Sequence, residues 1–354
     1  MSAESQIQES IPLPVNILLW QLPRWRGMID RLSNGQLAHA YLVSGDQGIG
    51  KLLFLRQLAR YMLCLEPQEI LPCGKCVNCR VSVCGYHPDI MLIQPEDDAR
   101  DIKIDQIRGL MKFISRTGHS GKAKIIIINH ANHLNISAAN SLLKSLEEPS
   151  PGTYLFLATS KADSLSATLR SRCQHLLLPT PSLAETEQWL SEQGIPSDQA
   201  PTLAAASGSR PFHALFLASV VGIAVASDFF RSLVALAQER IQVNSAVAIA
   251  VKTGEQVSVE YLLRASSIII KSLLTHEMPK DAVMGELLKS YLDFQDKVIL
   301  LKNLLRFNQS AEEAMRQLQG VSNPNTQLLL ESLMWQWSQL RSPLPESSTA
   351  FASK

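Results

Sequence analysis

Five short, almost uninterrupted apolar runs lie between residues 39 and 179, and segments with helical periodicity separate them. The runs are HAYLVSG (39–45), DIMLIQP (89–95), KIIIIN (124–129), TYLFLAT (153–159) and QHLLLP (174–179). A strand that is apolar along its whole length is buried on both faces, as happens in a parallel sheet covered by helices on each side. This part of the chain is therefore predicted to be an α/β domain.

Helices are predicted between these strands, at 52–63, 104–115 and 135–149. Asn135 or Ser137 can cap the last of them, and Pro149 prevents its extension. After residue 182 the strand patterns stop. Two or three short helices are expected in 183–218, and long amphipathic helices from about 219 to 340. The predicted organisation is an α/β domain (1–179), a small helical lid (180–218), an all-helical domain (219–342) and a disordered tail (343–354).

The charge balance excludes several classes of protein. Charged residues make up 18% of the chain, against a typical share of about 25%, and the formal net charge is +1. Near-neutrality argues against strong autonomous nucleic-acid binding, which needs an excess of cations.

The sequence shows neither a membrane span nor a signal peptide. The uncharged stretch 212–226 is shorter than the ~20 apolar residues of a membrane span, so it is interpreted as a buried helix. Residues 1–16 are polar and acidic, unlike a signal peptide. We therefore expect a cytoplasmic protein with no membrane partner.

A glycine-rich loop follows the first predicted strand and opens a helix. It reads Gly45-Asp-Gln-Gly48-Ile-Gly50-Lys51, the G-x-x-x-x-G-K pattern of a phosphate-binding loop. The glycines let backbone N–H groups point at phosphate oxygens, and Lys51 adds a cation. These four residues are the predicted nucleotide-binding residues, for ATP or ADP.

The residues that would hydrolyse the nucleotide are missing. Leu52 stands where a Ser or Thr hydroxyl would bind Mg²⁺. The strand 125–128 ends in Asn129-His130, where an Asp would hold the metal and a Glu would activate water. An amide is a poor replacement for a carboxylate at Mg²⁺. Three changes together predict a site that at most binds nucleotide without hydrolysing it.

Four cysteines lie within sixteen residues, as Cys64-x8-Cys73-x2-Cys76-x2-Cys79. C-x2-C steps present two thiolates to one ion, and four sulfurs match tetrahedral Zn²⁺. The last three are the firmer ligands, because Cys84 or His87 also lies near enough in sequence to replace Cys64. A site with four thiolates has no open position, so the zinc is predicted to be structural, in a module spanning about 64–87.

The order of these motifs resembles one known family. HAYLVSG, the glycine-rich loop, the cysteine insertion, HPD (87–89), ANSLLKSLEEP (139–149) and LRSRC (169–173) are similar to the delta-prime family of bacterial DNA polymerase III clamp-loader subunits. The resemblance implies an AAA+ P-loop domain with a zinc insertion, followed by a small helical domain and an all-helical collar that joins the subunits. It also selects Cys64 as the fourth zinc ligand.

The resemblance further implies a role for the segment Ser171-Arg172-Cys173. In the family, this arginine inserts into the ATP site of the adjacent subunit, where a guanidinium stabilises the charge on the γ-phosphoryl group. Arg172 is therefore the predicted arginine finger, acting in trans, and the protein's own site contributes no catalytic residue. Arg170 lies close enough to share the role. Thr159 matches the family's sensor-1 position, and Arg210 is not assigned to the second sensor.

The function implied is that of a subunit without intrinsic ATPase activity that supports sliding-clamp loading in DNA replication. Its partners would be the gamma/tau and delta subunits, with the sliding clamp and primer–template DNA reached through the complex. The nucleotidyltransferase activity would belong to the whole DNA polymerase III complex and not to this subunit. Two alternatives remain: an active gamma/tau-like AAA+ ATPase, and a zinc-dependent DNA-binding protein.

Overall fold

The computed structural model describes residues 17–342, except 84, 86, 97–100, 117, 219–222, 277–281, 293, 295 and 319–324. The predicted tail at 343–354 therefore lies outside the described residues. The chain divides into two compact units. The first takes the chain up to Ala200 together with Ser207–Phe216, and the second takes Pro201–Ala206 and the chain from Leu217 onward.

A five-stranded parallel sheet forms the centre of the first unit, with strand order β2-β3-β4-β1-β5. Its strands are β1 (Ala40–Ser44), β2 (Ile90–Ile93), β3 (Lys124–Ile128), β4 (Thr153–Thr159) and β5 (Gln174–Leu177). All five predicted strands are present, and the whole of β3 is buried. The predicted α/β class is thus confirmed.

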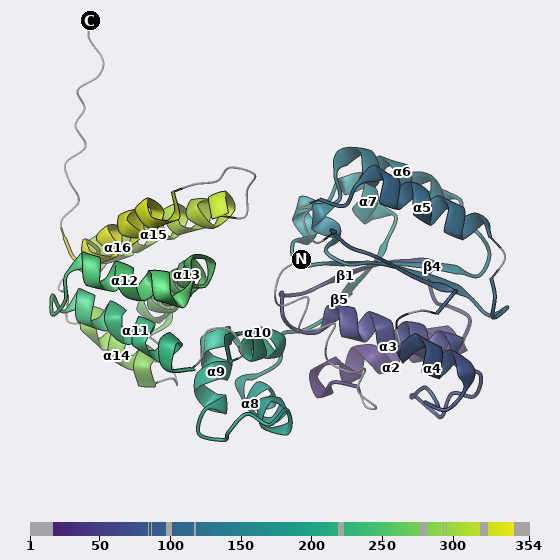
Figure 1. Cartoon of the computed structure of the whole chain (residues 1–354), viewed down its shortest axis with the longest axis horizontal. Helices are drawn as coiled ribbons and strands as arrows, with labels where there is room; N and C mark the ends of the chain where they lie inside the picture. Colours follow the sequence, from purple (N-terminus) through teal and green to yellow (C-terminus); the bar gives the residue numbers. More distant parts are fainter. Residues whose placement is uncertain are drawn as a thin grey trace, which may run out of the picture. The chain divides into compact units, whose positions relative to one another are not determined.

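Helices cover both faces of this sheet (Figure 1). One face carries α2 (Leu22–Ser33), α3 (Lys51–Leu63) and α4 (Val77–Val83), and the other carries α5 (Ile104–Ser115), α6 (Ile136–Glu147) and α7 (Ala167–Ser171). Asn135 caps α6, since its side chain accepts from the N–H of Ala138 at 2.8 Å. Trp25 of α2 and Phe54 of α3 are completely buried and pack edge to face. Apolar clusters on the two faces of the sheet hold its strands in place. The glycine-rich loop follows the end of β1.

Three short helices follow β5, as the punctuation by glycine and proline predicts. They are α8 (Leu183–Glu192), α9 (Ala200–Ser207) and α10 (Pro211–Phe216). The helix predicted over 212–226 falls partly on residues 219–222, which lie outside the described residues. On either side of them, α10 ends at Phe216 and α11 begins at Ile223. Phe212 of α10 packs against Trp189 in the first unit.

The described residues of the second unit form helices joined by short turns and loops. Its helices are α11 (Ile223–Ala237), α12 (Val243–Thr253), α13 (Glu255–Thr275), α14 (Ala282–Leu292), α15 (Lys297–Leu318) and α16 (Thr326–Ser338). Aromatic side chains fill its centre: Trp337 lies edge to face with Phe307 and Tyr291. The helical C-terminal part is thus as predicted. Among the described residues, no helix combines the length and apolar character needed to cross a membrane.

Candidate functional site

The glycine-rich loop joins β1 to α3 and has the backbone conformation that its sequence predicts. Gly45, Gly48 and Gly50 have φ angles of 149°, 81° and 87°, which residues with a side chain rarely adopt. A Cβ atom at Gly45 would lie 2.6 Å from the carbonyl oxygen of Leu178, and one at Gly50 would lie 2.7 Å from Phe212. Both conformation and space therefore require glycine in this loop.

The lysine of the motif contacts the loop itself. Lys51 Nζ donates hydrogen bonds to the carbonyl oxygens of Gly45 at 2.8 Å and Asp46 at 2.6 Å. Further along the loop, Trp20 Nε1 donates to the Ile49 carbonyl at 3.0 Å, and Gln21 Nε2 donates to the same oxygen at 3.0 Å. The N-terminal segment before α2 therefore holds the loop in its conformation, a contribution that no motif in the sequence indicated.

Helix α10 also contacts the loop, and α8 packs against α10. The N–H of Phe212 donates to the carbonyl of Gly48 at 3.0 Å, and a Cβ at Gly48 would lie 3.0 Å from Cβ of His213. Trp189 of α8 links this contact to the N-terminal segment, since its ring lies 4.9 Å from Phe212 and 6.0 Å from Trp20. These helices form one packed layer over the loop, in the region predicted to be a lid.

The positions that would bind Mg²⁺, and the predicted sensor-1 residue Thr159, are built into the protein core or already hydrogen-bonded. Leu52 is 1% exposed and belongs to the apolar cluster beneath β1. Asn129 is also buried, and its Nδ2 donates to Gln94 Oε1 at 3.3 Å. Thr159 Oγ1 donates to Asn132 at 3.2 Å and accepts from the N–H of Lys161 at 3.0 Å. None of these three side chains offers a carboxylate to a metal.

The four predicted zinc ligands converge on one point. Cys64 lies at the end of α3, Cys79 lies in α4, and Cys73 and Cys76 lie in the loop between them. All four Sγ atoms lie within 4.8 Å of one another, and those of Cys73 and Cys79 are 3.9 Å apart. Tetrahedral zinc, with Zn–S bonds of about 2.3 Å, needs sulfur–sulfur separations of about 3.8 Å. The donor set therefore has the composition and size of a structural zinc site.

The surroundings of the cluster shift the pKa values of its cysteines in opposite directions. Burial raises the pKa of Cys79 to about 12, whereas the backbone N–H groups of Cys76 and Lys75 lower the pKa of Cys73 to about 6. Backbone N–H groups point at the sulfurs: that of Cys73 at Cys64 (3.2 Å), and that of Cys76 at Cys73 (3.4 Å). Such donors suit thiolates, and thiolates this close repel one another unless a metal ion lies between them.

Of the two alternative fourth ligands, only His87 lies in the part of the chain that the structure describes, and it is not among the clustered donors. Cys84 lies outside the described residues. His87 is buried, and its Nδ1 accepts from the N–H of Asp89 at 3.1 Å. Asp89 in turn accepts from the N–H groups of His119 and Ser120, both at 2.6 Å. The HPD segment therefore connects the end of the cysteine module to the loop before β3, a structural role that its sequence alone did not reveal.

Arg172 lies at the C-terminal end of α7, with its guanidinium group bound to a carboxylate. Its Nε and Nη2 contact Glu147 Oε1 at 2.8 and 2.5 Å, and its Nη1 donates to the carbonyl of Thr168 at 3.0 Å. The two side chains are 33% and 51% exposed, so water screens the pair and its net contribution is at most about 1 kcal/mol. Arg170 makes a similar pair with Asp163 at 2.8 Å. Sequence reasoning did not identify Glu147 as a partner.

Comparison with known proteins identifies relatives for the first unit. Residues 21–182 match the model of a family described as "DNA polymerase III, delta subunit". The DNA polymerase III subunit delta' of Pseudomonas aeruginosa is 37% identical over 202 residues, which is 56% of this chain and 60% of that protein. The subunit delta' of Bacillus subtilis is 39% identical over 177 residues, covering 50% of this chain and 53% of the relative. The chain thus spans less than two thirds of the length of these relatives.

Two further matches have lower coverage or similarity. The DNA polymerase III subunit tau of Salmonella typhimurium is 36% identical over 142 residues, 40% of this chain and 22% of the relative. A solved structure of a gamma subunit-related DNA polymerase III protein from Thermotoga maritima aligns with a TM-score of 0.42 at 16% identity. It covers 89% of this chain and 99% of that chain.

Proposed function

Through residues 21–182 this chain belongs to the DNA polymerase III delta' family, and we propose that it serves as a clamp-loader subunit that hydrolyses no ATP of its own. The main observation behind this proposal concerns the residues at the two positions where Mg²⁺ would be bound. Leu52 is embedded in the apolar core, and Asn129 is buried and bound to Gln94. At these two positions a bound triphosphate would find neither the hydroxyl nor the carboxylate that normally holds Mg²⁺ in place.

The glycine-rich loop would then act as a structural connection, with at most a nucleotide bound and not hydrolysed. Lys51 stabilises the loop through its carbonyls, and α10 packs against Gly48. Nucleotide binding would require Lys51 to exchange these carbonyls for phosphate oxygens. This exchange needs no large movement, because a lysine side chain is flexible.

The protein's contribution to catalysis would be Arg172, inserted into the ATP site of a neighbouring gamma/tau-type subunit. A guanidinium there stabilises negative charge on the transferred phosphoryl group. Glu147 supports this reading, because it holds Arg172 in a half-exposed position through a pair that water screens. A triphosphate carries more negative charge than the Glu147 carboxylate. Exchanging Glu147 for a triphosphate would therefore strengthen the electrostatic attraction on Arg172.

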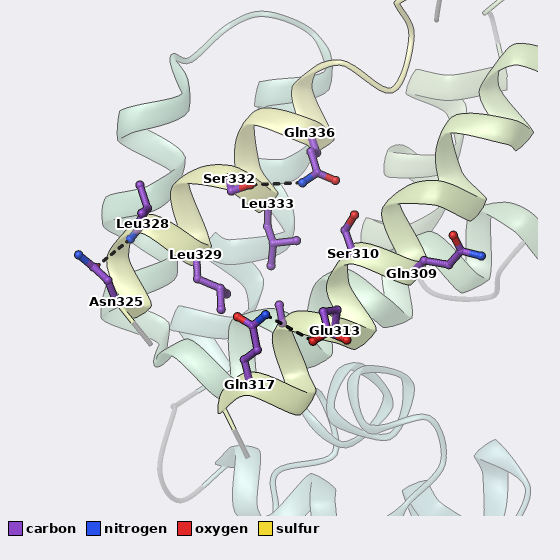
Figure 2. A pocket seen from close by; sticks show the side chains of 11 residues that line it. Gln309, Ser310, Glu313, Gln317, Asn325, Leu328, Leu329, Ser332, Leu333 and Gln336 are labelled. Carbon is purple, nitrogen blue, oxygen red and sulfur yellow. Dashed lines mark hydrogen bonds between the residues drawn. The ribbon is translucent and has the colours of Figure 1, made fainter. Parts of the chain in front are cut away.

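The second unit would form the collar that joins the subunits. A groove of about 740 Å³ runs along α15 and α16, with Leu329 and Leu333 beside amide side chains such as Gln317 (Figure 2). On α16, Leu328 and Trp335 are 63% and 58% exposed. Large apolar side chains left in solvent support a protein interface. Delta and gamma/tau subunits would be the partners there, with the sliding clamp and primer–template DNA reached through the assembled complex in the cytoplasm.

The four-cysteine cluster would hold one structural zinc ion. The metal would supply the charge that keeps Cys64, Cys73, Cys76 and Cys79 together, and α3 and α4 would be joined through it. Because all four ligands are cysteines, no position remains for substrate or water.

The experiment that tests the catalytic role compares Arg172, at the C-terminal end of α7, with Arg170, inside the same helix. The complex is reconstituted with ATPase-competent partner subunits, and its ATPase rate is measured with Arg172→Ala and with the control Arg170→Ala. Both side chains are 33% exposed and both are paired with a carboxylate, so the control matches in environment. We expect Arg172→Ala to lower turnover at the neighbouring site by roughly 10³-fold or more, with assembly intact.

An unchanged rate in Arg172→Ala would contradict the arginine finger. An equal loss in Arg170→Ala would contradict its assignment to Arg172 alone. The same assay on the isolated chain addresses the rival ATPase function, and salt-dependent DNA binding by the isolated chain addresses the rival zinc-dependent DNA-binding function.

A further inference from the structure

Asn78 lies between two of the predicted metal ligands and bonds to the neighbour of a third. It belongs to α4, directly before Cys79 and two residues after Cys76. Its Nδ2 atom donates a hydrogen bond to the backbone carbonyl of Leu63 at 2.8 Å, across 15 residues of chain. Leu63 is the last residue of α3 and directly precedes Cys64. One hydrogen bond therefore joins the helix that carries Cys79 to the helix end that carries Cys64.

The carbonyl of Leu63 depends on a donor from outside its own helix. The last four carbonyls of a helix have no hydrogen-bond partner within that helix. The N–H of the cap residue, Cys64, donates to the carbonyl of Tyr61 instead. Leu63 is 0% exposed, so water does not reach it. Removing the amide of Asn78 would therefore take away a donor that water cannot replace.

This contact acts directly on the position of Cys64. A peptide bond is planar, so the direction of the Leu63 carbonyl sets where the nitrogen and Cα of Cys64 lie. The next carbonyl, that of Cys64 itself, accepts a hydrogen bond from Nζ of Lys122, in the segment before β3. Side chains from two other parts of the chain therefore hold the carbonyls on either side of the Cys64 Cα.

Cys64 needs such support more than the other three ligands do. Cys73, Cys76 and Cys79 follow one another at three-residue steps, so local turns bring their sulfurs together. Cys64 lies nine residues before Cys73, at the end of another helix, so the packing of α3 against α4 sets its place. We propose that Asn78 is a positioning residue of the metal centre, which holds Cys64 at coordinating distance from the other sulfurs. The inference rests on the zinc site proposed above.

The experiment uses the full chain with Asn78→Leu and a matched control. Leucine keeps nearly the size and branching of asparagine but donates no hydrogen bond. Ser82→Ala is the control, because Ser82 also lies in α4 and is 5% exposed. Its hydroxyl donates to the carbonyl of Asn78 at 2.6 Å within the same helix, so its loss leaves the contact with Leu63 in place.

Two measurements follow the metal and the ligand separately. Competition with a chromogenic chelator measures the zinc affinity. Alkylation by iodoacetamide, mapped for each cysteine by mass spectrometry, measures which sulfur becomes accessible, in the zinc-bound chain and in the chain stripped of metal. Cys64 and Cys79 are 1% and 0% exposed, so Cys79 is the internal reference within the module. Cys173, which is buried outside the module, reports any general loss of the fold.

We expect Asn78→Leu to lower the zinc affinity by about 10-fold or more, since groups that support metal ligands typically contribute 10- to 100-fold. Alkylation should rise at Cys64 and much less at Cys79, with and without metal. Ser82→Ala should stay close to the wild type in both measurements, because a hydroxyl bonded to the carbonyl four residues earlier contributes little to a helix.

Three outcomes would overturn the inference. They are an unchanged zinc affinity in Asn78→Leu, an equal loss of affinity in Ser82→Ala, and alkylation that rises equally at Cys64 and Cys79. The last result would mean that Asn78 serves the general stability of α4. A wild-type chain that binds no zinc would contradict the metal site itself, whereas alkylation of the metal-free chain would still test the contact between Asn78 and Leu63.

Discussion

The glycine-rich loop and the four-cysteine module lie at opposite ends of the same helix, α3. They differ in whether the side chains that their chemistry needs are present. At the N-terminal end, the loop retains the backbone of a phosphate site, with Gly50 in a left-handed conformation, but Leu52 has replaced the metal-binding hydroxyl. At the C-terminal end, the module retains all four sulfurs around one point. Packing can therefore maintain the backbone conformation of such a loop without a metal-binding side chain at position 52. A metal cluster with one ligand fewer would lose its structural role as well.

The largest effect expected from this comparison concerns the module. Cys73→Ser should abolish the binding of one zinc per chain, because a serine hydroxyl is a poor substitute for a thiolate. The loop between α3 and α4 should then lose order, because metal-binding free energy is local folding free energy. Metal analysis measures the zinc, and proteolysis within residues 64–83 measures the order. Cys173→Ser is the control, since Cys173 is buried far along the sequence from the cluster. Full zinc retention in Cys73→Ser would contradict the assigned ligand set.

A smaller effect is expected at the loop, where two glycines allow the packing contribution to be isolated. Gly50 and Gly194 both have a φ angle of 87°, but a Cβ at Gly50 would lie 2.7 Å from Phe212, whereas one at Gly194 would meet nothing within 4 Å. Substitution by alanine should cost about 1 kcal/mol at Gly194 from conformation alone, and about 2–4 kcal/mol at Gly50. Urea unfolding of the two variants measures the difference. Equal losses would mean that the packing of α10 against the loop contributes little.

The packing within these regions was less predictable from the sequence than their existence. The five strands and the helices between them could be predicted, because apolar runs of strand length alternate with a helical period. The sulfur cluster could be predicted from ligand spacing. The roles of Trp20, Glu147 and Asp89 could not, since each acts on a residue distant in sequence: Ile49, Arg172 and Ser120. Contacts of this kind depend on tertiary structure and leave no periodic pattern in the sequence.

Asp89 allows a pH-dependent test of the connection between the module and the sheet. Burial alone would raise the pKa of Asp89, but hydrogen bonds from Ser120 and His119 outweigh it and lower the pKa below its ordinary value of 3.8. A carboxylate with a lowered pKa contributes stability above its unfolded pKa and loses it as the pH falls through the folded value. Asp89→Asn should therefore destabilise the protein by about 1–3 kcal/mol at pH 7.

This difference between Asp89→Asn and the wild type should shrink as the pH falls below about 4, the range in which an unperturbed aspartate becomes protonated. Asp105→Asn is the control, because Asp105 lies in an exposed pair with Arg108 and should change stability by less than about 0.5 kcal/mol. A destabilisation of Asp89→Asn that is independent of pH would show that the carboxylate charge is not the cause.

The central claim is that this chain keeps a phosphate-loop backbone without hydrolysing nucleotide there. It is tested most directly by Mg²⁺-dependent ATP hydrolysis of the isolated, purified chain, with and without primed DNA, for the wild type and for Lys51→Ala. The account predicts no turnover above background for either protein, because Leu52 and Asn129 cannot hold the metal ion. Substantial turnover by the wild type that Lys51→Ala abolishes would contradict the account.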